Sequence, residues 1–266
     1  MEDKSPELET AIKAALEAGK VLEKYFETEI LRETKDDESI VTQADKECEE
    51  IIKKIIFDAF PKHSILGEET GMTENDSDCV WHIDPIDGTR NFANGIPLFA
   101  ISIALVCGKD LKVGVIHNPN LNALFYAEKG KGAYWNHNKM HVSKDDAKHG
   151  IVTISSGRKE NDLKIRRNLM HELPGGAISA VRDFGCSALD LAYVARGNTE
   201  ADVKFGLKTY DFTAGLLLIQ EAGGRITKLD GTPWELPETS YVASNGVFHD
   251  LLIEEIKKQK LKLNLE

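Results

Sequence analysis

Apolar residues in the first sixty positions follow a helical period in two stretches. In residues 7–27 most of them recur three to five positions apart, which predicts an amphipathic helix. A second helix is predicted over residues 43–60, because Thr42 can cap its start and Pro61 ends it. Residues 28–39 between these helices are charged and aperiodic, so we expect a loop or an exposed hairpin there, and a candidate mobile flap.

Short apolar runs bounded by turn residues predict the strands of the first half. Two of them, residues 64–67 and 80–83, are followed directly by acidic residues. The others are separated by turns that contain Gly, Asp, Asn or Pro. They predict an antiparallel sheet made from residues 100–107, 113–117, 123–127 and 150–155.

The second half alternates between helical and strand patterns. The predicted helices are residues 163–173, 186–196, 211–221 and 248–260, and the predicted strands are residues 180–182, 201–205 and 225–228. Two sheets with helices between and around them would account for this order, which is a mixed α/β (α+β) fold. We expect one unit over residues 1–266, with the acidic strand ends and antiparallel sheet in residues 1–155 and the alternating part in residues 156–266.

Charge and composition narrow the class of partner. The chain has 41% hydrophobic and 29% charged residues, as is ordinary for a globular protein, and a formal net charge of -11. An acidic surface repels nucleic acid, whereas bound cations can reverse the field inside a pocket and admit a small anionic substrate. The chain has no apolar run of roughly 20 residues and no signal-peptide pattern, so we expect a cytoplasmic protein without a membrane partner.

The four cysteines are scattered along the chain. Cys48, Cys79, Cys107 and Cys186 form no CxxC pair, which argues against a zinc site and against a disulfide framework. We therefore expect four reduced thiols.

The strongest candidate for chemistry is the segment from Trp81 to Phe92, in which Asp84 and Asp87 bracket Pro85 after an apolar strand. A rigid turn there can aim two carboxylates and one backbone carbonyl at a hard, oxygen-seeking cation. Gly88-Thr89 then opens a predicted short helix, whose free N–H groups suit a phosphate. The alternative interpretation is that Asp87-Gly88 is simply a hairpin turn.

Other acids occupy comparable positions at the ends of predicted elements. Glu68 follows a strand, and Asp45 and Asp211 lie in the first turns of helices. Taken singly, an acid at a helix start needs no functional role, because its charge interacts favourably with the helix dipole. Glu68 and Glu69 are likewise explained as a pair of acids exposed to solvent.

These motifs together resemble the inositol monophosphatase family, within the lithium-sensitive, magnesium-dependent sugar phosphatases. The resemblance extends over nearly the whole chain. It rests on residues 67–69 (GEE), 84–92 (DPIDGTRNF), 210–215 (YDFTAG) and 221–224 (EAGG), which have the family's order and approximate spacing. It implies the family's layered αβαβα sandwich, the sugar-phosphatase fold.

The resemblance also implies roles for individual residues. One Mg²⁺ ion would be held by Glu68, Asp84 and the carbonyl of Ile86, and a second by Asp84, Asp87 and Asp211, while Glu68 would also face a third, weaker site. Asp45 and Thr89 would orient the attacking water, so that Asp45, Thr89 and Glu68 are the expected catalytic residues. Phosphate would meet Asp87, Gly88 and Thr89.

The substrate side departs from the family pattern. The resemblance implies contacts with substrate at Gly185, Cys186, Ser187 and Asp211, although the first three residues are equally explained as a closely packed helix start. Where inositol-preferring members carry Glu, this chain has Lys204. Lysine can only donate hydrogen bonds and would prefer a second anionic group, which adds weight to a bisphosphate substrate. The alternative is that Lys204 points to solvent.

The sequence therefore predicts a Mg²⁺-dependent phosphoric monoester hydrolase for a small polyol or sugar phosphate, with inositol 1-phosphate first. Fructose 1,6-bisphosphatase, or a dual activity, is the alternative. Further alternatives are a histidinol-phosphate phosphatase, a nucleotide 3'-phosphatase and a catalytically silent metal-binding regulator. The resemblance also implies lithium sensitivity and a homodimer.

Overall fold

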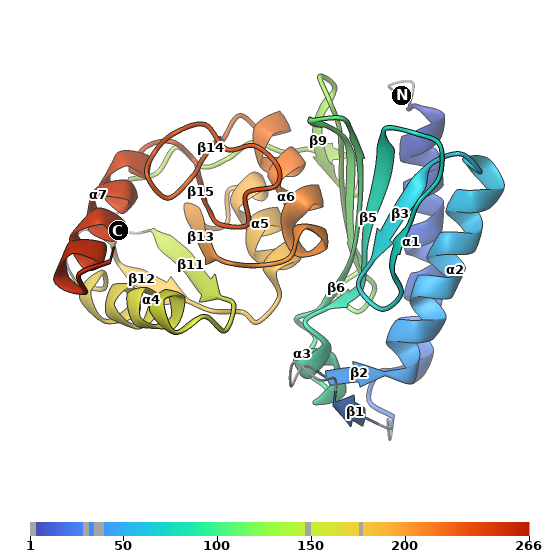
Figure 1. Ribbon diagram of the computed structural model, residues 1–266, viewed down its shortest axis with the longest axis horizontal. Helices are drawn as coiled ribbons and strands as arrows, with labels where there is room; N and C mark the ends of the chain where they lie inside the picture. Colours follow the sequence, from blue (N-terminus) through green and yellow to red (C-terminus); the bar gives the residue numbers. More distant parts are fainter. Residues whose placement is uncertain (1–3, 29–31, 35–39, 147–149, 176–177, 266) are drawn as a thin grey trace.

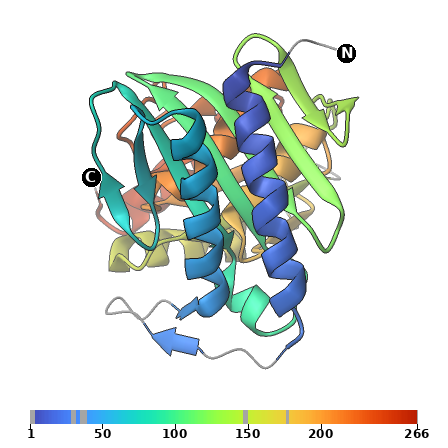
Figure 2. The same cartoon turned by 90° about the vertical axis from the view of Figure 1, so that its right-hand side faces the viewer.

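The computed structural model describes residues 4–28, 32–34, 40–146, 150–175 and 178–265. Their helices and sheets form five layers, as Figure 1 shows, so the predicted αβαβα sandwich is confirmed. The helix layers are, in order across the molecule, α1 (Pro6–Tyr25) with α2 (Gln43–Ala59), α5 (Ser187–Arg196) with α6 (Thr209–Glu221), and α4 (Glu160–Glu172) with α7 (His249–Lys262). Figure 2 shows α1 and α2 side by side across one face of the larger sheet.

The larger sheet has eight strands and follows α1 and α2. Its order is β10 (Asn138–Lys139), β9 (Gly132–Trp135), β8 (Ala123–Glu128), β7 (Asp110–Asn118), β6 (Ala100–Cys107), β5 (Cys79–Asp87), β3 (Ser64–Gly67) and β4 (Gly71–Thr73). Neighbouring strands are antiparallel except for β3 and β5, which are parallel. The antiparallel prediction is therefore confirmed for the runs that became β6, β7 and β8.

The second sheet has five strands, in the order β12 (Ala180–Arg182), β11 (Ile151–Ser156), β13 (Ala201–Phe205), β15 (Tyr241–Ser244) and β14 (Arg225–Thr227). Strand β11 pairs in parallel with both β12 and β13. The prediction that residues 150–155 belong to the first, antiparallel sheet is wrong, and the division at residue 155 cuts through a strand of the second sheet. Strand β15 was not predicted.

The remaining elements lie at one end of the layers. Strand β1 (Arg32–Thr34) pairs antiparallel with β2 (Ile40–Thr42), in agreement with the hairpin alternative for this region. Residues 29–31 and 35–39 of the expected flap lie outside the described residues. A helix of five residues, α3 (Thr89–Ala93), follows β5, as the sequence predicted.

Packing against the sheets follows the polarity of each helix. Helix α1 buries the alanines Ala11, Ala14, Ala15 and Ala18, so it lies close against the eight-stranded sheet. Helix α6 buries residues around its whole circumference, because it lies between the two sheets. Asp211 at the N-terminus of α6 is thereby fixed beside the first sheet.

One cysteine prediction is wrong. Cys79 and Cys107 face each other across β5 and β6 and form a disulfide, whereas Cys48 and Cys186 are free and buried. The spacing of 28 residues carried no signal for this bond, which depends on strand register. Among the described residues, no helix is both long and apolar enough to cross a bilayer.

Candidate active site

Strand β5 presents Asp84 and Asp87 to one cavity. The strand continues through Pro85 to Asp87, so this segment is not the turn that the sequence predicted. Residues three apart on a regular strand point to opposite faces, but the pairing of β5 with β6 shifts register between Asp84 and Asp87. Both side chains therefore line the same cavity. Oδ1 of Asp84 accepts the N–H of Ile86 at 3.0 Å.

Gly88 turns the chain sharply after β5. Its φ of 87° is left-handed, and a Cβ there would lie 2.9 Å from the carbonyl oxygen of Leu98 and 3.1 Å from that of Gly185. Only glycine fits this approach. Helix α3 starts at once, and the Thr89 hydroxyl lies 2.9 Å from the carbonyl oxygen of Ile86.

Asp45 stands behind Thr89, in the first turn of α2. Its Oδ2 accepts the N–H and hydroxyl of Thr42 at 2.7 and 2.6 Å, as in a capping box, and its Oδ1 lies 3.3 Å from the Thr89 hydroxyl. Burial raises the pKa of Asp45 to about 7, against the lowering effect of the Thr42 hydrogen bonds. Asp45 therefore reaches the cavity through Thr89.

Glu68 lies at the end of β3, where its N–H donates to the carbonyl of Ile83 at 3.0 Å. The turn that follows is held by Glu49 of α2, whose buried carboxylate accepts the N–H groups of Glu69 and Thr70 at 2.8 and 3.0 Å. Sequence reasoning missed Glu49. The available signal was an acid on the inward stripe of the second helix.

The C-terminal half supplies the remaining contacts. Asp211 lies in the first turn of α6, where its Oδ2 accepts the N–H of Lys208 at 3.0 Å. Oδ2 of Asp87 accepts the N–H of Ala188, at the start of α5, and lies 3.3 Å from Sγ of Cys186. No described residue donates a hydrogen bond to Oδ1 of Asp87, which leaves that oxygen for another ligand.

These side chains surround a cavity of about 370 Å³. The structure brings together Glu68, Ile86, Gly88, Thr89, Gly185, Cys186 and Ser187 with the three aspartates Asp84, Asp87 and Asp211. Its lining also contains residues that the sequence did not single out, namely Arg90, Ser155, Ser156, Asp183 and Leu207. The predicted site residues thus meet in one place, with two exceptions: Asp45 lies behind Thr89, and Lys204 is buried outside the described lining.

Both expectations for Lys204 are wrong. Its side chain is fully buried, so it does not point to solvent, and it is absent from the described lining of the cavity. Its ammonium instead forms ion pairs with Asp190 of α5 and Asp202 of β13. A strand pattern cannot distinguish a lysine that faces a cavity from one that is neutralised within the core.

Burial, together with repulsion between neighbouring carboxylates, sets the electrostatics of the cavity. Burial raises the pKa of Asp84 and Asp211, and the neighbouring carboxylates add to the effect. For Asp84 these neighbours are Glu68, Asp87 and Asp211. Burial also raises the pKa of Asp87, to about 6, although the N–H of Ala188 opposes this. Asp84, Asp87 and Asp211 therefore bind protons or cations more readily than isolated acids do.

The donor set fits a hard divalent cation. Carboxylate and carbonyl oxygens are the ligands that Mg²⁺ prefers, and the only cationic side chain in the described lining is Arg90. Among the described residues, no group of three or more His, Cys, Asp or Glu side chains is already arranged to hold a metal ion. A bound cation would therefore have to draw the carboxylates closer together.

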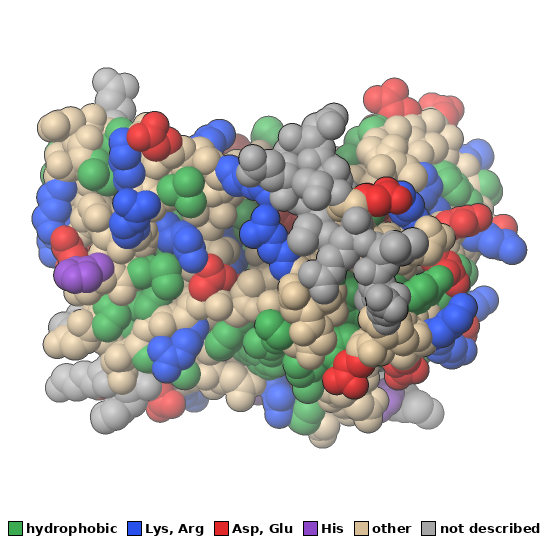
Figure 3. Space-filling model, turned by 90° about the horizontal axis from the view of Figure 1, so that it is seen from below, with side chains coloured by type: hydrophobic (Ala, Val, Ile, Leu, Met, Phe, Trp, Pro, Cys, Tyr) green, Lys and Arg blue, Asp and Glu red, His purple; other side chains and the backbone are tan. Residues whose placement is uncertain are grey.

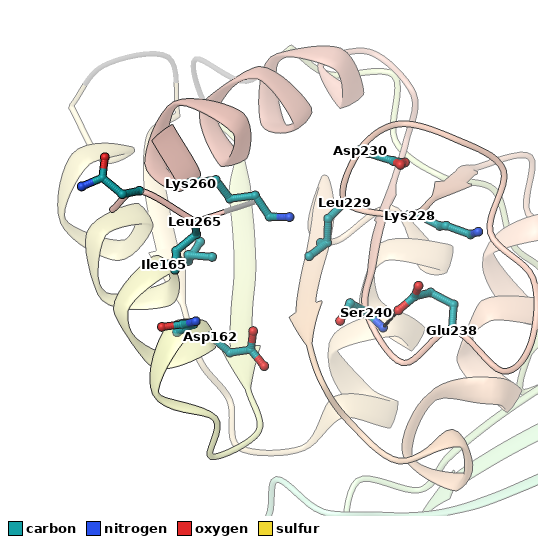
Figure 4. A pocket seen from close by; sticks show the side chains of 11 residues that line it. Asp162, Ile165, Lys228, Leu229, Asp230, Glu238, Ser240, Lys260 and Leu265 are labelled. Atoms are coloured by element: carbon teal, nitrogen blue, oxygen red, sulfur yellow. Dashed lines mark hydrogen bonds between the residues drawn. The ribbon is translucent and has the colours of Figure 1, made fainter. Parts of the chain in front are cut away.

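A larger cavity of about 630 Å³ lies elsewhere, between α4, α7 and the loop before β15. Figure 4 shows that Lys260 and Asp162 extend into this space, while Leu229 and Ile165 provide apolar walls. Its charged groups are mixed rather than a cluster of acids. The smaller cavity is therefore the better candidate for metal chemistry.

Comparisons with known proteins agree with this geometry. The sequence profile of the inositol monophosphatase family matches residues 3–261. The chain is 36% identical over 263 residues to a fructose-1,6-bisphosphatase/inositol-1-monophosphatase of Aquifex aeolicus, covering 97% of this chain and 98% of the relative. It is 39% identical over 260 residues to an inositol-1-monophosphatase of Mesorhizobium japonicum, covering 94% and 96%.

Solved structures give the same result. The crystal structure of the extragenic suppressor protein suhB from Bartonella henselae superposes with a TM-score of 0.88 and 32% identity, covering 96% of this chain and 99% of that one. The sequence match, the fold and the acidic cavity thus lead to one assignment: this chain belongs to the inositol monophosphatase family of phosphoric monoester hydrolases.

Proposed function

We propose that this protein is a magnesium-dependent phosphatase that hydrolyses a small polyol or sugar phosphate, with inositol 1-phosphate as the first candidate. The observation that carries the proposal is the convergence of Glu68, Asp84, Asp87 and Asp211 from both halves of the chain onto one cavity. Burial and neighbouring acids raise the pKa values of Asp84, Asp87 and Asp211, and a bound cation would relieve the repulsion among them.

These residues would form two main ligand sets and border a third site. Glu68, Asp84 and the carbonyl of Ile86 would hold one Mg²⁺ ion, and Asp84, Asp87 and Asp211 would hold a second, with Glu68 facing a third, weaker site. When bound, the ions would supply charge neutralisation at the phosphoryl group and a more acidic water.

Thr89 and Asp45 would position the attacking water. The Thr89 hydroxyl lies between the Asp45 carboxylate and the cavity, so it can donate to Asp45 and accept a hydrogen bond from water. The N–H groups of Gly88 and Thr89 would donate to phosphate oxygens.

Replacing Thr89 by Val should lower kcat by about 100-fold or more, because the hydroxyl is lost while the shape is kept. Thr89→Ser keeps the hydroxyl and should retain kcat within about tenfold. Steady-state kinetics at saturating Mg²⁺ measure both. Equal kcat values for the Val and Ser variants would remove Thr89 from the water-positioning role.

Because Lys204 is buried, it no longer supports fructose 1,6-bisphosphate. The face that carries α3 and α4 is nonetheless rich in Lys and Arg over the C-terminal part of the molecule, as Figure 3 shows, although the whole chain is acidic. Together with the dual name of the Aquifex relative, this keeps the bisphosphate as a second candidate.

A substrate panel tests the proposal. Inorganic phosphate release should be measured for inositol 1-phosphate, fructose 1,6-bisphosphate, histidinol phosphate and a nucleotide 3'-phosphate, with Mg²⁺, with and without Li⁺. We expect the highest kcat/KM for inositol 1-phosphate and inhibition by Li⁺. If none of the four releases phosphate, the alternative of a catalytically silent metal-binding regulator is favoured.

We also propose a cytoplasmic homodimer, on the family resemblance and composition. The Cys79–Cys107 disulfide is unusual for a cytoplasmic protein, which makes cell fractionation the direct test of location. Sedimentation analysis tests the dimer.

A further inference from the structure

A buried cluster of three charges lies behind the candidate active site. The side chains of Lys204, Asp190 and Asp202 are at most 1% exposed. The Lys204 ammonium is paired with Oδ2 of Asp190 and lies 3.1 Å from Oδ1 of Asp202. One cation therefore serves two buried carboxylates, one on helix α5 and the other on strand β13.

The two carboxylates depend on Lys204 to different degrees. Asp202 also accepts the Thr153 hydroxyl at 2.6 Å and the Tyr241 hydroxyl at 3.0 Å, so the second sheet holds it from both neighbouring strands. Oδ1 of Asp190 has no hydrogen-bond partner among the described residues, and Lys204 is the cation paired with its other oxygen. The ion pair is therefore the polar contact that links Asp190 on α5 to Lys204 on β13, and it is called the tie below.

Helix α5 connects this tie to the acidic cavity. Asp190 lies in the first turn of α5, and its N–H donates to the carbonyl of Cys186 at 3.0 Å. The same turn presents the N–H of Ala188 and the thiol of Cys186 to Oδ2 of Asp87. A shift of this turn would move the donors that orient Asp87.

We propose that Lys204 is a positioning residue, which fixes the first turn of α5 to β13 so that Ala188 and Cys186 hold Oδ2 of Asp87 and leave Oδ1 for a divalent cation. This inference rests on the proposed function, because it takes Asp87 to be a metal ligand. Residues that orient metal ligands typically change metal affinity by about 10- to 100-fold when they are replaced.

The competing explanation is that Lys204 only neutralises buried acids. Removal of one partner from a buried ion pair destabilises a protein strongly, whereas replacement of all partners by uncharged groups is often tolerated. A weaker Mg²⁺ response of the single variant Lys204→Met would therefore fit both explanations. The triple variant Lys204→Met, Asp190→Asn, Asp202→Asn can separate them, because it removes the buried charge together with the tie.

The readout is the Mg²⁺ concentration that gives half of the maximal rise in melting temperature. For Lys204→Met we expect a lowered melting temperature and a half-maximal concentration raised about tenfold or more. For the triple variant we expect most of the melting temperature to return while the half-maximal concentration stays raised. KM for the substrate should change little, since Lys204 is not in the described lining of the cavity.

Lys228→Met is the matched control. Lys228 lies in the same half of the chain, on the remote cavity of Figure 4, and should leave the Mg²⁺ response unchanged. A triple variant with the wild-type half-maximal concentration would overturn the proposal, as would a folded Lys204→Met variant with that value. A wild-type protein without any Mg²⁺ response would contradict the proposed function itself, and the inference with it.

Discussion

Replacement of Asp84 by Asn should lower kcat/KM by about a thousandfold or more. Asp84 is 2% exposed, and its pKa is raised by burial and by the charges of Glu68, Asp87 and Asp211. It is the acid that both proposed ions would share. The loss of several kcal/mol of charge stabilisation, for instance about 4 kcal/mol, corresponds to roughly 1,000-fold in rate. Asparagine keeps the shape and can still accept the N–H of Ile86.

The same substitution should have the opposite effect on stability in chelator. Asparagine removes an acid whose ionised form is disfavoured by burial and by neighbouring acids, so the metal-free variant should melt at or above the wild-type temperature at pH 7.5. Asp58→Asn, an exposed position on α2, is the control and should change neither property. An Asp84→Asn variant with more than a tenth of the wild-type kcat/KM would exclude Asp84 as the shared ligand.

Removal of metal should abolish activity and lower the melting temperature. Binding at 100 times Kd stabilises a protein by about 2.7 kcal/mol, which for a chain of this size corresponds to a rise of about 5–10 °C. Calorimetry in excess chelator, followed by addition of Mg²⁺, measures the effect. Melting curves that coincide in chelator and in Mg²⁺ would contradict a folded-state metal site.

The rise in melting temperature caused by Mg²⁺ should also depend on pH. The pKa values of Asp87 and Asp45 are raised to about 6 and about 7, so the folded protein binds more protons than the unfolded chain above pH 4. The contribution of these acids to stability is therefore lost as pH rises from about 4 to 7.

Buried histidines act in the opposite direction over the same pH range. The pKa values of His82 and His249 are lowered to about 4 by burial, so their contribution to stability increases as pH rises. The quantity that isolates the acids is the difference in melting temperature between Mg²⁺ and chelator at each pH. We expect this difference to be larger at pH 7.5 than at pH 5.5, and an equal or smaller value at pH 7.5 would contradict the assignment.

The sequence predicted the features that depend on local patterns. Helix α2 was predicted to within one residue, because a cap, an apolar stripe and a terminating proline coincide there. The cavity residues from Asp84 to Thr89 were identified because glycine, proline and paired acids are unusual after a buried strand. Their relation to Glu68 and Asp211 came from family resemblance.

Features that depend on distant pairing were not predictable in this way. Strand β11 has the same local pattern as the strands of the first sheet, and only its partners β12 and β13, which follow later, place it in the second. The disulfide depends on the register of β5 and β6. Lys204 faces Asp190 because residues of a helix and a strand meet in the core, which the sequence around Lys204 does not encode.

The contact between Asp87 and Ala188 joins residues that are 101 positions apart, and Asp211 lies further still along the chain. During synthesis, Glu68, Asp84 and Asp87 leave the ribosome well before their partners exist. A nascent chain that ends before α5 thus has these three acids close together, but it lacks the N–H of Ala188 and the proposed ligand Asp211 that would organise them. Cation capture should accordingly be a late event of biogenesis, available to the finished chain and not to its N-terminal fragment.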